Sequence, residues 1–396
     1  MSEVLLHRTP VVTRSQELAG YELQLRSRHG ESAAAGGLSA LLAGQSADTD
    51  FFQRLPDRFA LADCEQVEAL KPAAPPGQFV LGLRADGTAD LDALCRKCKS
   101  AGFGVCVLDP QNSAWTDALL SQAGYLRLSS AQLNGTLAKY SQLLRRHGAK
   151  QIAADLRTRA DFDAAQKAGC DLFSGYFFLE PQGAEAHTIN PSYNTIIGLM
   201  RLAQDNAPIG KIDDLLKRDA ALSYKLLRYI NSAGFGLSCE IQSFRHAVTM
   251  LGYQNLHRWL ALLLVTAGKQ TGSAALVGAA IVRGRLAELL AQGLFDAKER
   301  DNLFIVGAFS LLHVILCIPL EEVTETITLP EAITDALSAR QGPYGPILQL
   351  VELLEQLSQP GAASKASDLA MSLGLPLDAV NRAQLDALAW SESLGQ

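Results

Sequence analysis

DAALSYKLLRYINSAGFGL, residues Asp219–Leu237, is the stretch from which the second half of the chain can be understood. Its apolar residues recur at steps of three and four, which predicts a helix with one buried face. These residues are Leu222, Leu226, Leu227 and Ile230. Small residues at Asn231–Gly236 predict a turn that closes this helix. Downstream, the string from Ser243 to Gly252 predicts another helix, which begins at the serine and ends at Leu251-Gly252.

Almost every segment from Pro191 onward shows the same helical periodicity, and turn residues separate the segments. These turns are Asn206-Ala207-Pro208, Ser232-Ala233-Gly234 and Gln341-Gly342-Pro343. Because no long strand-forming alternation occurs, we expect this half to be all-α. Residues 183–191, GAEAHTINP, are small and polar and end in proline, and we place the boundary between the two halves there.

The first half alternates strand-sized apolar runs with helix-like segments. The runs are Glu17–Arg26, Phe79–Leu83, Gly104–Leu108, Tyr125–Leu128 and Gln151–Leu156. The helical segments are Leu91–Ala101, Thr116–Ala123, Ala138–His147 and Arg159–Ala168, followed by Gly102, Gly124, Gly148 and Gly169, where left-handed backbone is expected. Such alternation predicts parallel strands with crossover helices, in an open sheet or a closed barrel.

Composition limits the classes of protein to which this chain can belong. Of its 396 residues 48% are hydrophobic and 19% charged, which excludes an intrinsically disordered chain. The net charge of -6 disfavours nucleic acid and acidic membranes as partners. The start of the chain lacks a secretory signal and no apolar run is long enough to span a membrane, so we expect a cytoplasmic protein. Its seven cysteines, including the close pair Cys95 and Cys98, are interpreted as reduced thiols without zinc.

The Asp219–Leu237 string resembles the D-x-x-L-s-x-x-L-L-x-x-x-N-S-a-x-x-g run of the HDOD family, over roughly residues 189–349. The resemblance implies a helical relative of the HD phosphohydrolases that lacks their metal-binding His-Asp set. His313 stands where a metal-ligating histidine would be, but Val314 replaces the following aspartate. At the earlier ligand helix the chain offers Arg283 and Arg285 and no histidine. We therefore expect neither a metal nor metal-dependent hydrolysis in this half.

In the first half, Gly20–Arg26 (GYELQLR) resembles the G-x-E-A-L-x-R strand of the EAL family. Asp171–Phe178 with Pro181 resembles the closing D-x-x-Q-G-y-x-f-x-x-P segment of that family. EAL domains are barrels of the (β/α)₈ type that hydrolyse cyclic di-GMP with two divalent cations. We therefore predict an α/β plus all-α chain, with a degenerate EAL-type barrel at residues 1–185 and an HDOD-like helical domain at residues 189–396.

The barrel is called degenerate because most of the carboxylates that the resemblance implies are missing. Glu22 matches the first metal-binding glutamate, Asp109 survives in a loop, and Arg127 stands where the catalytic lysine would be. The positions at which carboxylates are lost are Gly82, Ala85, Pro110, Ser129, Ala154 and Arg157. Two anionic positions cannot hold a metal pair against a phosphodiester. We expect Glu22 to pair with Arg26 or Arg127, and Asp109 to begin a turn.

These observations favour a non-enzymatic signalling adaptor that docks partner proteins, without a cofactor. The alternative is a cyclic di-GMP-binding sensor or a weak cyclic di-GMP phosphodiesterase. Arginines at or near strand ends would then contact phosphates, namely Arg26, Arg84, Arg127 and Arg157. The two functions differ in whether these arginines converge in an open pocket or pair with Glu22 and Asp155. The sequence leaves open whether the chain forms a homodimer.

The docking surface for a partner is predicted on the HDOD-like half, around its first helices and the Asn231–Gly236 turn. Its candidate residues are Asn231, Phe235, Leu237 and Tyr253. Exposed aromatic anchors dominate many interfaces. The alternatives are that the large apolar side chains complete the core and that the Asn231 amide caps a helix.

Overall fold

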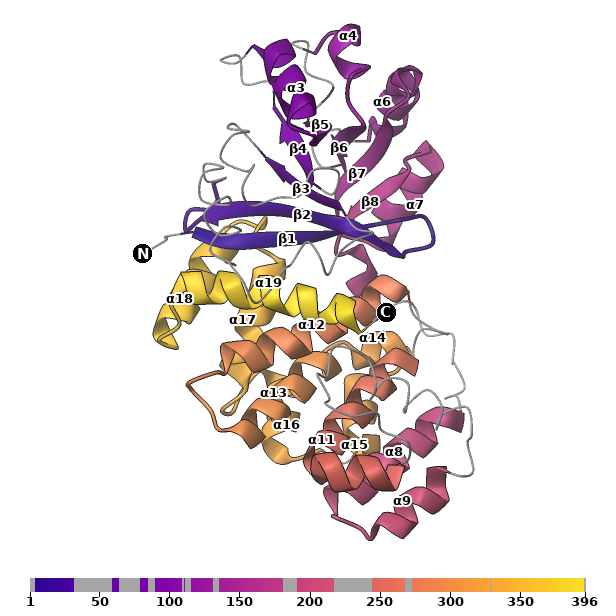
Figure 1. The fold of residues 1–396 in the computed structure, drawn as a ribbon, viewed down its shortest axis with the longest axis vertical. Helices are drawn as coiled ribbons and strands as arrows, with labels where there is room; N and C mark the ends of the chain where they lie inside the picture. The colour runs from indigo at the N-terminus through magenta and orange to yellow at the C-terminus, as the bar shows by residue number, and fades with distance from the viewer. Residues whose placement is uncertain are drawn as a thin grey trace. The chain divides into compact units, whose positions relative to one another are not determined.

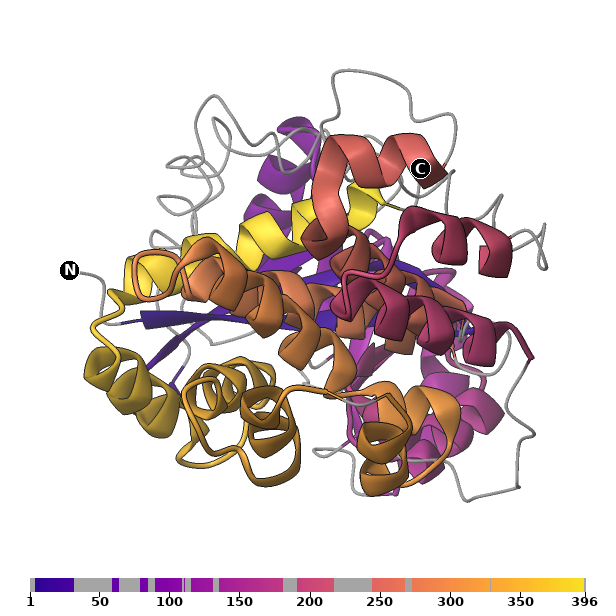
Figure 2. The ribbon, with the colours of Figure 1, turned by 90° about the horizontal axis from the view of Figure 1, so that it is seen from below.

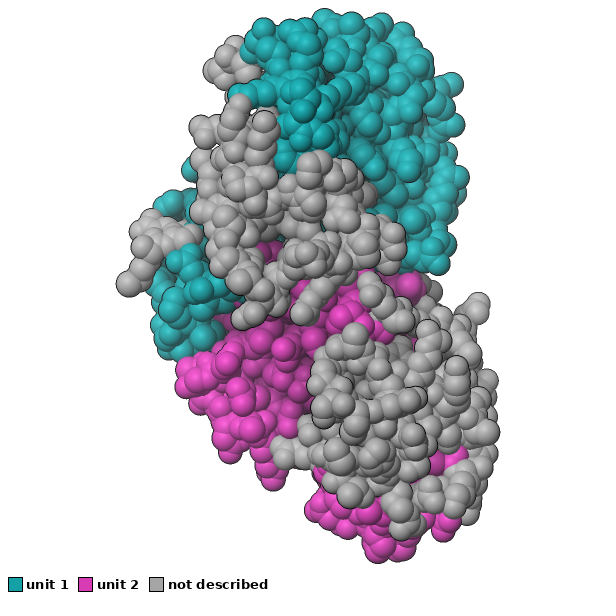
Figure 3. Space-filling view, in the orientation of Figure 1, with its two compact units in different colours: residues 1–180, 353–382 teal, residues 181–352, 383–396 magenta. Residues whose placement is uncertain are grey.

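The computed structural model describes residues 4–31, 59–63, 79–84, 90–108, 110, 115–130, 135–180, 191–216, 244–267, 273–327 and 329–394. The chain divides into two compact units, each built from two stretches of sequence (Figure 3). Unit 1 comprises Met1–Glu180 and Leu353–Arg382, and unit 2 comprises Pro181–Glu352 and Ala383–Gln396. The sequence interpretation gave all residues from 189 onward to the helical domain, whereas the structure groups residues 353–382 with the barrel.

Unit 1 contains a closed barrel whose strands follow one another in chain order (Figure 1). They are β1 (Val4–Val12), β2 (Leu18–Ser27), β3 (Phe59–Asp63), β4 (Phe79–Leu83), β5 (Gly104–Leu108), β6 (Tyr125–Ser129), β7 (Lys150–Leu156) and β8 (Leu172–Gly175). Strand β1 runs antiparallel to both β2 and β8, and the other neighbouring pairs are parallel. Of the two architectures that the sequence left open, the closed barrel is therefore the one adopted.

Helices and short 3-10 turns connect the strands of the barrel. They are α3 (Leu91–Ser100), α4 (Asp117–Leu120), α6 (Leu137–Leu144), η1 (Arg145–His147), α7 (Arg159–Ala168) and η2 (Phe177–Leu179). Helix α7 begins at a capping box, in which Thr158 and Asp161 each accept a hydrogen bond from the other's backbone N–H. Hydrogen bonds of this kind fix the start of a crossover helix close to the end of the preceding strand.

Three of the four glycines expected to be left-handed have positive φ angles: 85° at Gly102, 72° at Gly148 and 91° at Gly169. The expectation for Gly124 was wrong, because its φ does not lie in the left-handed region. Helix α4 is short and ends in right-handed backbone at Ser121. The N–H of Gly124 then donates to the Val105 carbonyl, so this glycine already belongs to the approach to β6.

The part of unit 2 that the structure describes is helical apart from an isolated bridge between Gln292 and Phe295, which confirms the all-α prediction. Its helices are α8 (Pro191–Gln204), α9 (Ile209–Leu216), α11 (Phe244–Ala267), α12 (Ala274–Leu290), α13 (Ala297–Phe309), α14 (Leu312–Leu316), α15 (Leu320–Ile327) and α16 (Glu331–Ala339). Helix α12 packs along α13, and α8 packs along α11 (Figure 2). The predicted helix end at Gly252 is confirmed as a kink in α11, where φ is 74°.

Three further helices complete the C-terminal part of the chain: α17 (Gly345–Glu355), α18 (Ala362–Ser372) and α19 (Leu377–Ser393). Helix α18 belongs to unit 1, whereas α17 and α19 each have residues in both units. Among the helices described, none is both long enough and apolar enough to cross a membrane.

Candidate functional site

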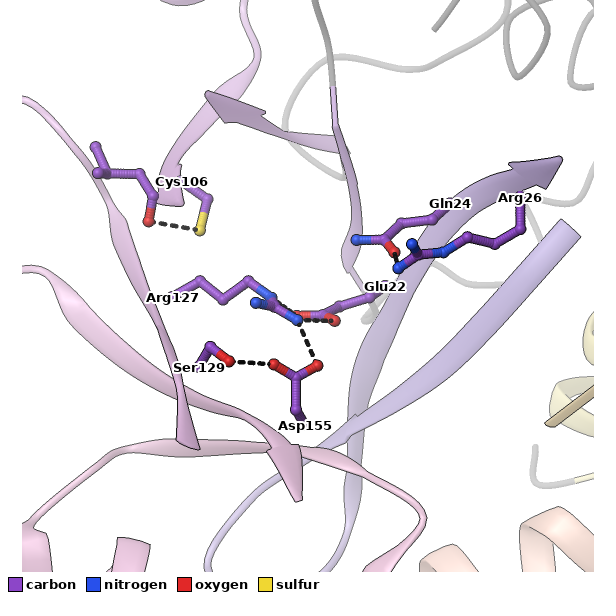
Figure 4. Close-up of polar contacts among 8 residues, drawn as sticks. Glu22, Gln24, Arg26, Cys106, Arg127, Ser129 and Asp155 are labelled. Carbon is purple, nitrogen blue, oxygen red and sulfur yellow. Dashed lines mark hydrogen bonds and ion pairs between the residues drawn. The ribbon is translucent and has the colours of Figure 1, made fainter. Parts of the chain in front are cut away.

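Four side chains from three strands form a polar network inside the barrel (Figure 4). Arg127 on β6 donates from Nε to Glu22 Oε1 on β2 at 2.9 Å and from Nη2 to Glu22 Oε2 at 3.4 Å. The same Nη2 donates to Asp155 Oδ1 on β7 at 3.0 Å. Ser129 Oγ donates to the other oxygen of Asp155 at 2.5 Å. The sequence offered Arg26 or Arg127 as partner of Glu22, and Arg127 is the partner.

Strand geometry explains why these side chains meet. Arg127 and Ser129 are two residues apart on β6, so both project from the same face of the strand. Glu22 and Arg127 are only 4% and 9% exposed, which places this ion pair inside the protein. Ser129 ends β6 and Asp155 is the penultimate residue of β7, so the network lies toward the carboxyl ends of these strands. In barrels of this class, that end carries the functional residues.

Asp155 reaches the network through an irregularity in β7. Its φ is 61°, which is left-handed, and the β7–β8 register shifts between Ala153 and Leu156. A β-bulge of this kind changes the direction of a side chain. On β8, Gly175 has a φ of 147°, and a Cβ there would collide with the Leu156 carbonyl oxygen. The close approach of these two backbones holds the bulge in place.

The Arg127 guanidinium offsets part of the negative charge of the two carboxylates. Burial pushes the pKa of Asp155 upward, but the Arg127 guanidinium and the Ser129 hydrogen bond outweigh burial and hold it below the ordinary value. Asp155 is therefore an anion at neutral pH. One guanidinium thus bridges two carboxylates, with a bidentate contact to Glu22 and a single hydrogen bond to Asp155.

This donor set does not fit the pair of divalent cations that the EAL resemblance implies. Arg127 already takes both Glu22 oxygens and one Asp155 oxygen, so a cation near them would meet a fixed positive charge. Ser129 and Ala154 occupy two positions where the resemblance implies carboxylates. Within the described ranges, no three His, Cys, Asp or Glu side chains are grouped so that they could hold a metal ion.

A cavity of about 210 Å³ lies beside the network, within unit 1. Asp155 contributes to its wall, together with residues of β1, of the segments after β7 and β8, and of the segment after α17. The lining residues are His7, Thr9, Asp155, Leu156, Arg157, Gly175, Tyr176, Leu179, Glu355, Gln356, Ser358 and Gln359. This volume is below the roughly 300–1,000 Å³ of ordinary ligand pockets.

His7 is a buried titratable group in the wall of this cavity. Burial, followed by repulsion from Arg26, lowers the pKa of His7 to about 3, so the imidazole is neutral at physiological pH. Its ring makes a hydrogen bond with the backbone of Glu355, which lies near the other end of the sequence. His7 was not predicted from the sequence, although a histidine within the apolar run VLLHRTPVV is a signal that could have found it.

The four arginines proposed as phosphate contacts do not share one environment. Arg127 pairs with Glu22 and Asp155, and Arg26 donates to the Gln24 side chain at 2.7 Å and to the Gly30 carbonyl at 3.2 Å. Arg84 is exposed, and Arg157 is exposed and lines the cavity. Asp109 lies outside the described residues. Pairing with carboxylates favours an adaptor, and this is the arrangement of Arg127. An open pocket favours a ligand sensor, and Arg157 lines such a cavity.

Comparison with known protein families gives a match to part of the second half of the chain. The profile of the HDOD domain matches residues 188–327. This chain contains an HDOD domain. Together with the eight-stranded barrel before it, this confirms the predicted order of an α/β barrel followed by an HDOD domain.

Several known proteins are similar to this chain in sequence or in fold. It is 24% identical to the uncharacterized protein YuxH of Bacillus subtilis, over 99% of this chain and 98% of that protein. It is 28% identical to the cyclic di-GMP phosphodiesterase CdgJ of Vibrio cholerae, over 62% of this chain and 56% of that protein. A standalone EAL protein from Vibrio cholerae O395, solved with c-di-GMP bound, is 16% identical and covers 48% of this chain and 96% of its own, with a TM-score of 0.35.

Within the HDOD domain, the residues singled out from sequence have ordinary packing environments or lie outside the described residues. Tyr253 is half-buried, and its hydroxyl donates to the Ala207 carbonyl at 2.5 Å. Asn231, Phe235 and Leu237 lie outside the described residues. Burial, followed by Arg340 and Arg283, lowers the pKa of His313, so its imidazole is neutral. Val314 beside it is buried and supplies no oxygen ligand.

Proposed function

We propose that this chain is a non-enzymatic adaptor in cyclic di-GMP signalling, which docks partner proteins. The arrangement that carries the proposal is the fork from Arg127 to Glu22 and Asp155. Hydrolysis of a phosphodiester by two metals needs free carboxylates and a group that activates water. Here a permanent cation engages the carboxylates, and arginine is too weak an acid to transfer protons near neutral pH. The connection to cyclic di-GMP rests on the relatives, one of which is a cyclic di-GMP phosphodiesterase.

The test of inactivity is a hydrolysis assay on the purified full chain, with cyclic di-GMP and magnesium or manganese. An active EAL phosphodiesterase serves as positive control. We expect turnover no higher than in buffer. Turnover clearly above buffer that disappears in Glu22→Ala would contradict the proposal, whereas activity that survives this substitution would be a contaminant.

The adaptor role has its own test, because inactivity alone does not establish docking. Cross-linking of the full chain in its native cell, followed by mass spectrometry, identifies partner peptides and the residues to which they are joined. We expect cross-links to concentrate in the HDOD domain around residues 231–253, and to weaken in Phe235→Ala. Cross-links confined to barrel residues would show that the interface lies on the barrel and would contradict the predicted docking surface.

A second candidate is a sensor that binds cyclic di-GMP without cleaving it. It is favoured by the exposed Arg157 at the cavity beside Asp155. Isothermal titration of the full chain with cyclic di-GMP tests this candidate. A sensor predicts saturable binding that Arg157→Ala weakens at least tenfold and that Arg96→Ala, at an exposed arginine of α3, leaves unchanged. Heat indistinguishable from dilution would eliminate the sensor.

A further inference from the structure

Residues 353–382 are attached to the N-terminal hairpin of the barrel, and the most specific attachment is made by Asn381. Asn381 Oδ1 accepts from the Leu6 backbone N–H at 2.7 Å, and Nδ2 donates to the Val4 carbonyl at 2.9 Å. Both Asn381 and Leu6 are no more than 1% exposed. Strand β8 pairs with β1 only at Val11 and Val12, so over Val4–Leu6 this side-chain amide makes bonds of the kind that a neighbouring strand would make.

Two further contacts join the same segment to the hairpin. The His7 ring hydrogen-bonds to the backbone of Glu355, and Arg28 on the loop after β2 forms an ion pair with Asp368 of α18. The ion pair is half-exposed on both sides, so it adds little to stability. The two buried polar contacts, at Asn381 and at His7, therefore fix the position of the segment. The surface ion pair contributes less.

The contact between this segment and the barrel differs from the contacts within the barrel. Barrel strands are joined by continuous backbone ladders, whereas the attachments of the segment described above are individual side-chain bonds. The 210 Å³ cavity also lies in this contact, with Glu355, Gln356, Ser358 and Gln359 on one side and residues of β1, β7 and β8 on the other. A contact that encloses a cavity lacks the dispersion energy of close packing. The segment also buries apolar side chains, among them Leu354, Leu357 and Val380, but separation here breaks no strand ladder and therefore costs less free energy than unfolding the barrel.

We propose that residues 353–382 are a releasable clasp, which closes the barrel beside Asp155 and can open while the barrel stays folded. Opening removes one wall of the cavity and increases the exposure of Asp155, the residue that joins the cavity to the Arg127 network. Helices α17 and α19, which enter and leave this segment, continue into unit 2. A change in those helices therefore acts on the clasp through the chain itself. The clasp does not depend on the proposed function.

The test is hydrogen exchange measured by mass spectrometry on the full chain, in the wild type and in Asn381→Ala. We expect exchange at the Leu6 amide and across residues 355–372 to become at least tenfold faster, while peptides from β5, β6 and β7 keep their wild-type rates. The matched control is Asn302→Ala in α13, which removes a side-chain bond to the Tyr344 hydroxyl in unit 2. It should leave the Leu6 amide unchanged.

Two results would overturn the clasp. Wild-type exchange at Leu6 in Asn381→Ala would show that the amide does not hold the segment. Equal acceleration in every barrel strand would show that the segment is an inseparable part of the barrel. If Asn381→Ala does not fold, hydrogen exchange of the wild type in urea below the unfolding transition decides, because the contact that is easiest to open then exchanges first. Acceleration confined to residues 4–7 and 355–372 then supports the clasp, and barrel-wide acceleration refutes it.

Discussion

At the scale of single residues, the site depends on the charge of Arg127. Its guanidinium pairs with two carboxylates that come from different strands, and the three side chains form one largely buried group of ion pairs. Buried ion pairs add little net stability compared with apolar residues of the same size, but breaking them is costly because a charge is left without compensation. Loss of Arg127 should therefore affect stability more than loss of a surface arginine.

We expect Arg127→Met to lower the free energy of unfolding by about 3 kcal/mol at neutral pH, because two carboxylates lose their cation. The value lies at the low end of the usual range because the Asp155 side chain is 35% exposed. Arg127→Lys keeps the charge without the fork and should lose about half as much. Urea unfolding of the full chain measures both variants, and a Met variant as stable as the wild type would contradict the role of this network.

His7 should make the stability of the barrel depend on pH. Its pKa is about 3 in the folded chain, against about 6.5 for an unperturbed histidine. Between these values the unfolded chain binds more protons, so stability falls as the pH decreases from about 6.5, by up to about 1.4 kcal/mol per pH unit. His7→Gln, which keeps an N–H for the Glu355 backbone, should remove most of this dependence between pH 6.5 and 5.

The pH dependence of stability that His7 causes can be measured by hydrogen exchange of the β1 peptides at several pH values. The matched control is His257→Gln in unit 2, since burial lowers the pKa of His257 as well. This control should leave the pH dependence of the β1 peptides as in the wild type. An unchanged dependence in His7→Gln would mean that other groups cause it.

At the scale of elements, the β7–β8 pair shows how backbone geometry positions a side chain. The register shift, the left-handed Asp155 and the close approach at Gly175 occur together over a few residues. Left-handed backbone at a non-glycine residue costs free energy and persists only where its surroundings hold it. In the β7–β8 pair, Gly175 lets the two backbones lie close together, and this contact holds Asp155 in its left-handed conformation.

We expect Gly175→Ala to lower the free energy of unfolding by about 2–4 kcal/mol, because a Cβ would be forced against the Leu156 carbonyl in a strained backbone. Gly148→Ala is the matched control, since its φ is also positive but nothing lies within 4 Å of an added Cβ. It should lose about 1 kcal/mol. Thermal and urea unfolding compare the two, and equal losses would show that the close approach does not matter.

The strands β4, β5, β6 and β7 could be predicted from sequence because each is a short, largely apolar run followed by a helical segment. Strand β1 could not be predicted, because His7, Arg8 and Pro10 interrupt its apolar pattern although all three are buried. The pairing of Glu22 with Arg127 was within reach, since motifs located both strands. The contribution of Asp155 depends on a bulge that no local sequence pattern predicts. The contact of Asn381 with Leu6 could not be predicted either, because 375 residues separate the two in sequence.

At the scale of the whole molecule, the barrel unit is discontinuous, since its residues come from both ends of the chain. A domain boundary drawn near residue 185 separates the β1 edge from Asn381 and His7 from Glu355. Such a boundary leaves buried polar groups without their partners, and each loss costs about 1–3 kcal/mol. Small domains have only about 5–15 kcal/mol of total stability.

We therefore expect a chain ended at residue 352 to keep a folded barrel that unfolds at a lower urea concentration than in the full chain. Supplying residues 353–396 as a second chain in the same cell should restore the soluble yield and the midpoint, because the missing segment makes side-chain bonds rather than a continuous strand ladder. Soluble yield and circular dichroism measure the outcome. A chain ending at residue 352 that unfolds with the midpoint of the full chain would show that the barrel is self-sufficient.

The discontinuity of unit 1 also has a consequence for how the protein is made. The ribosome delivers the β1–β2 hairpin first, and about 170 residues of unit 2 follow residue 180 before the segment that bonds to Leu6 is synthesised. At roughly 5–20 residues per second, this interval is on the order of 10–35 s. During this time the nascent barrel carries an uncompleted strand edge, which a chaperone or another nascent chain can contact before Asn381 emerges.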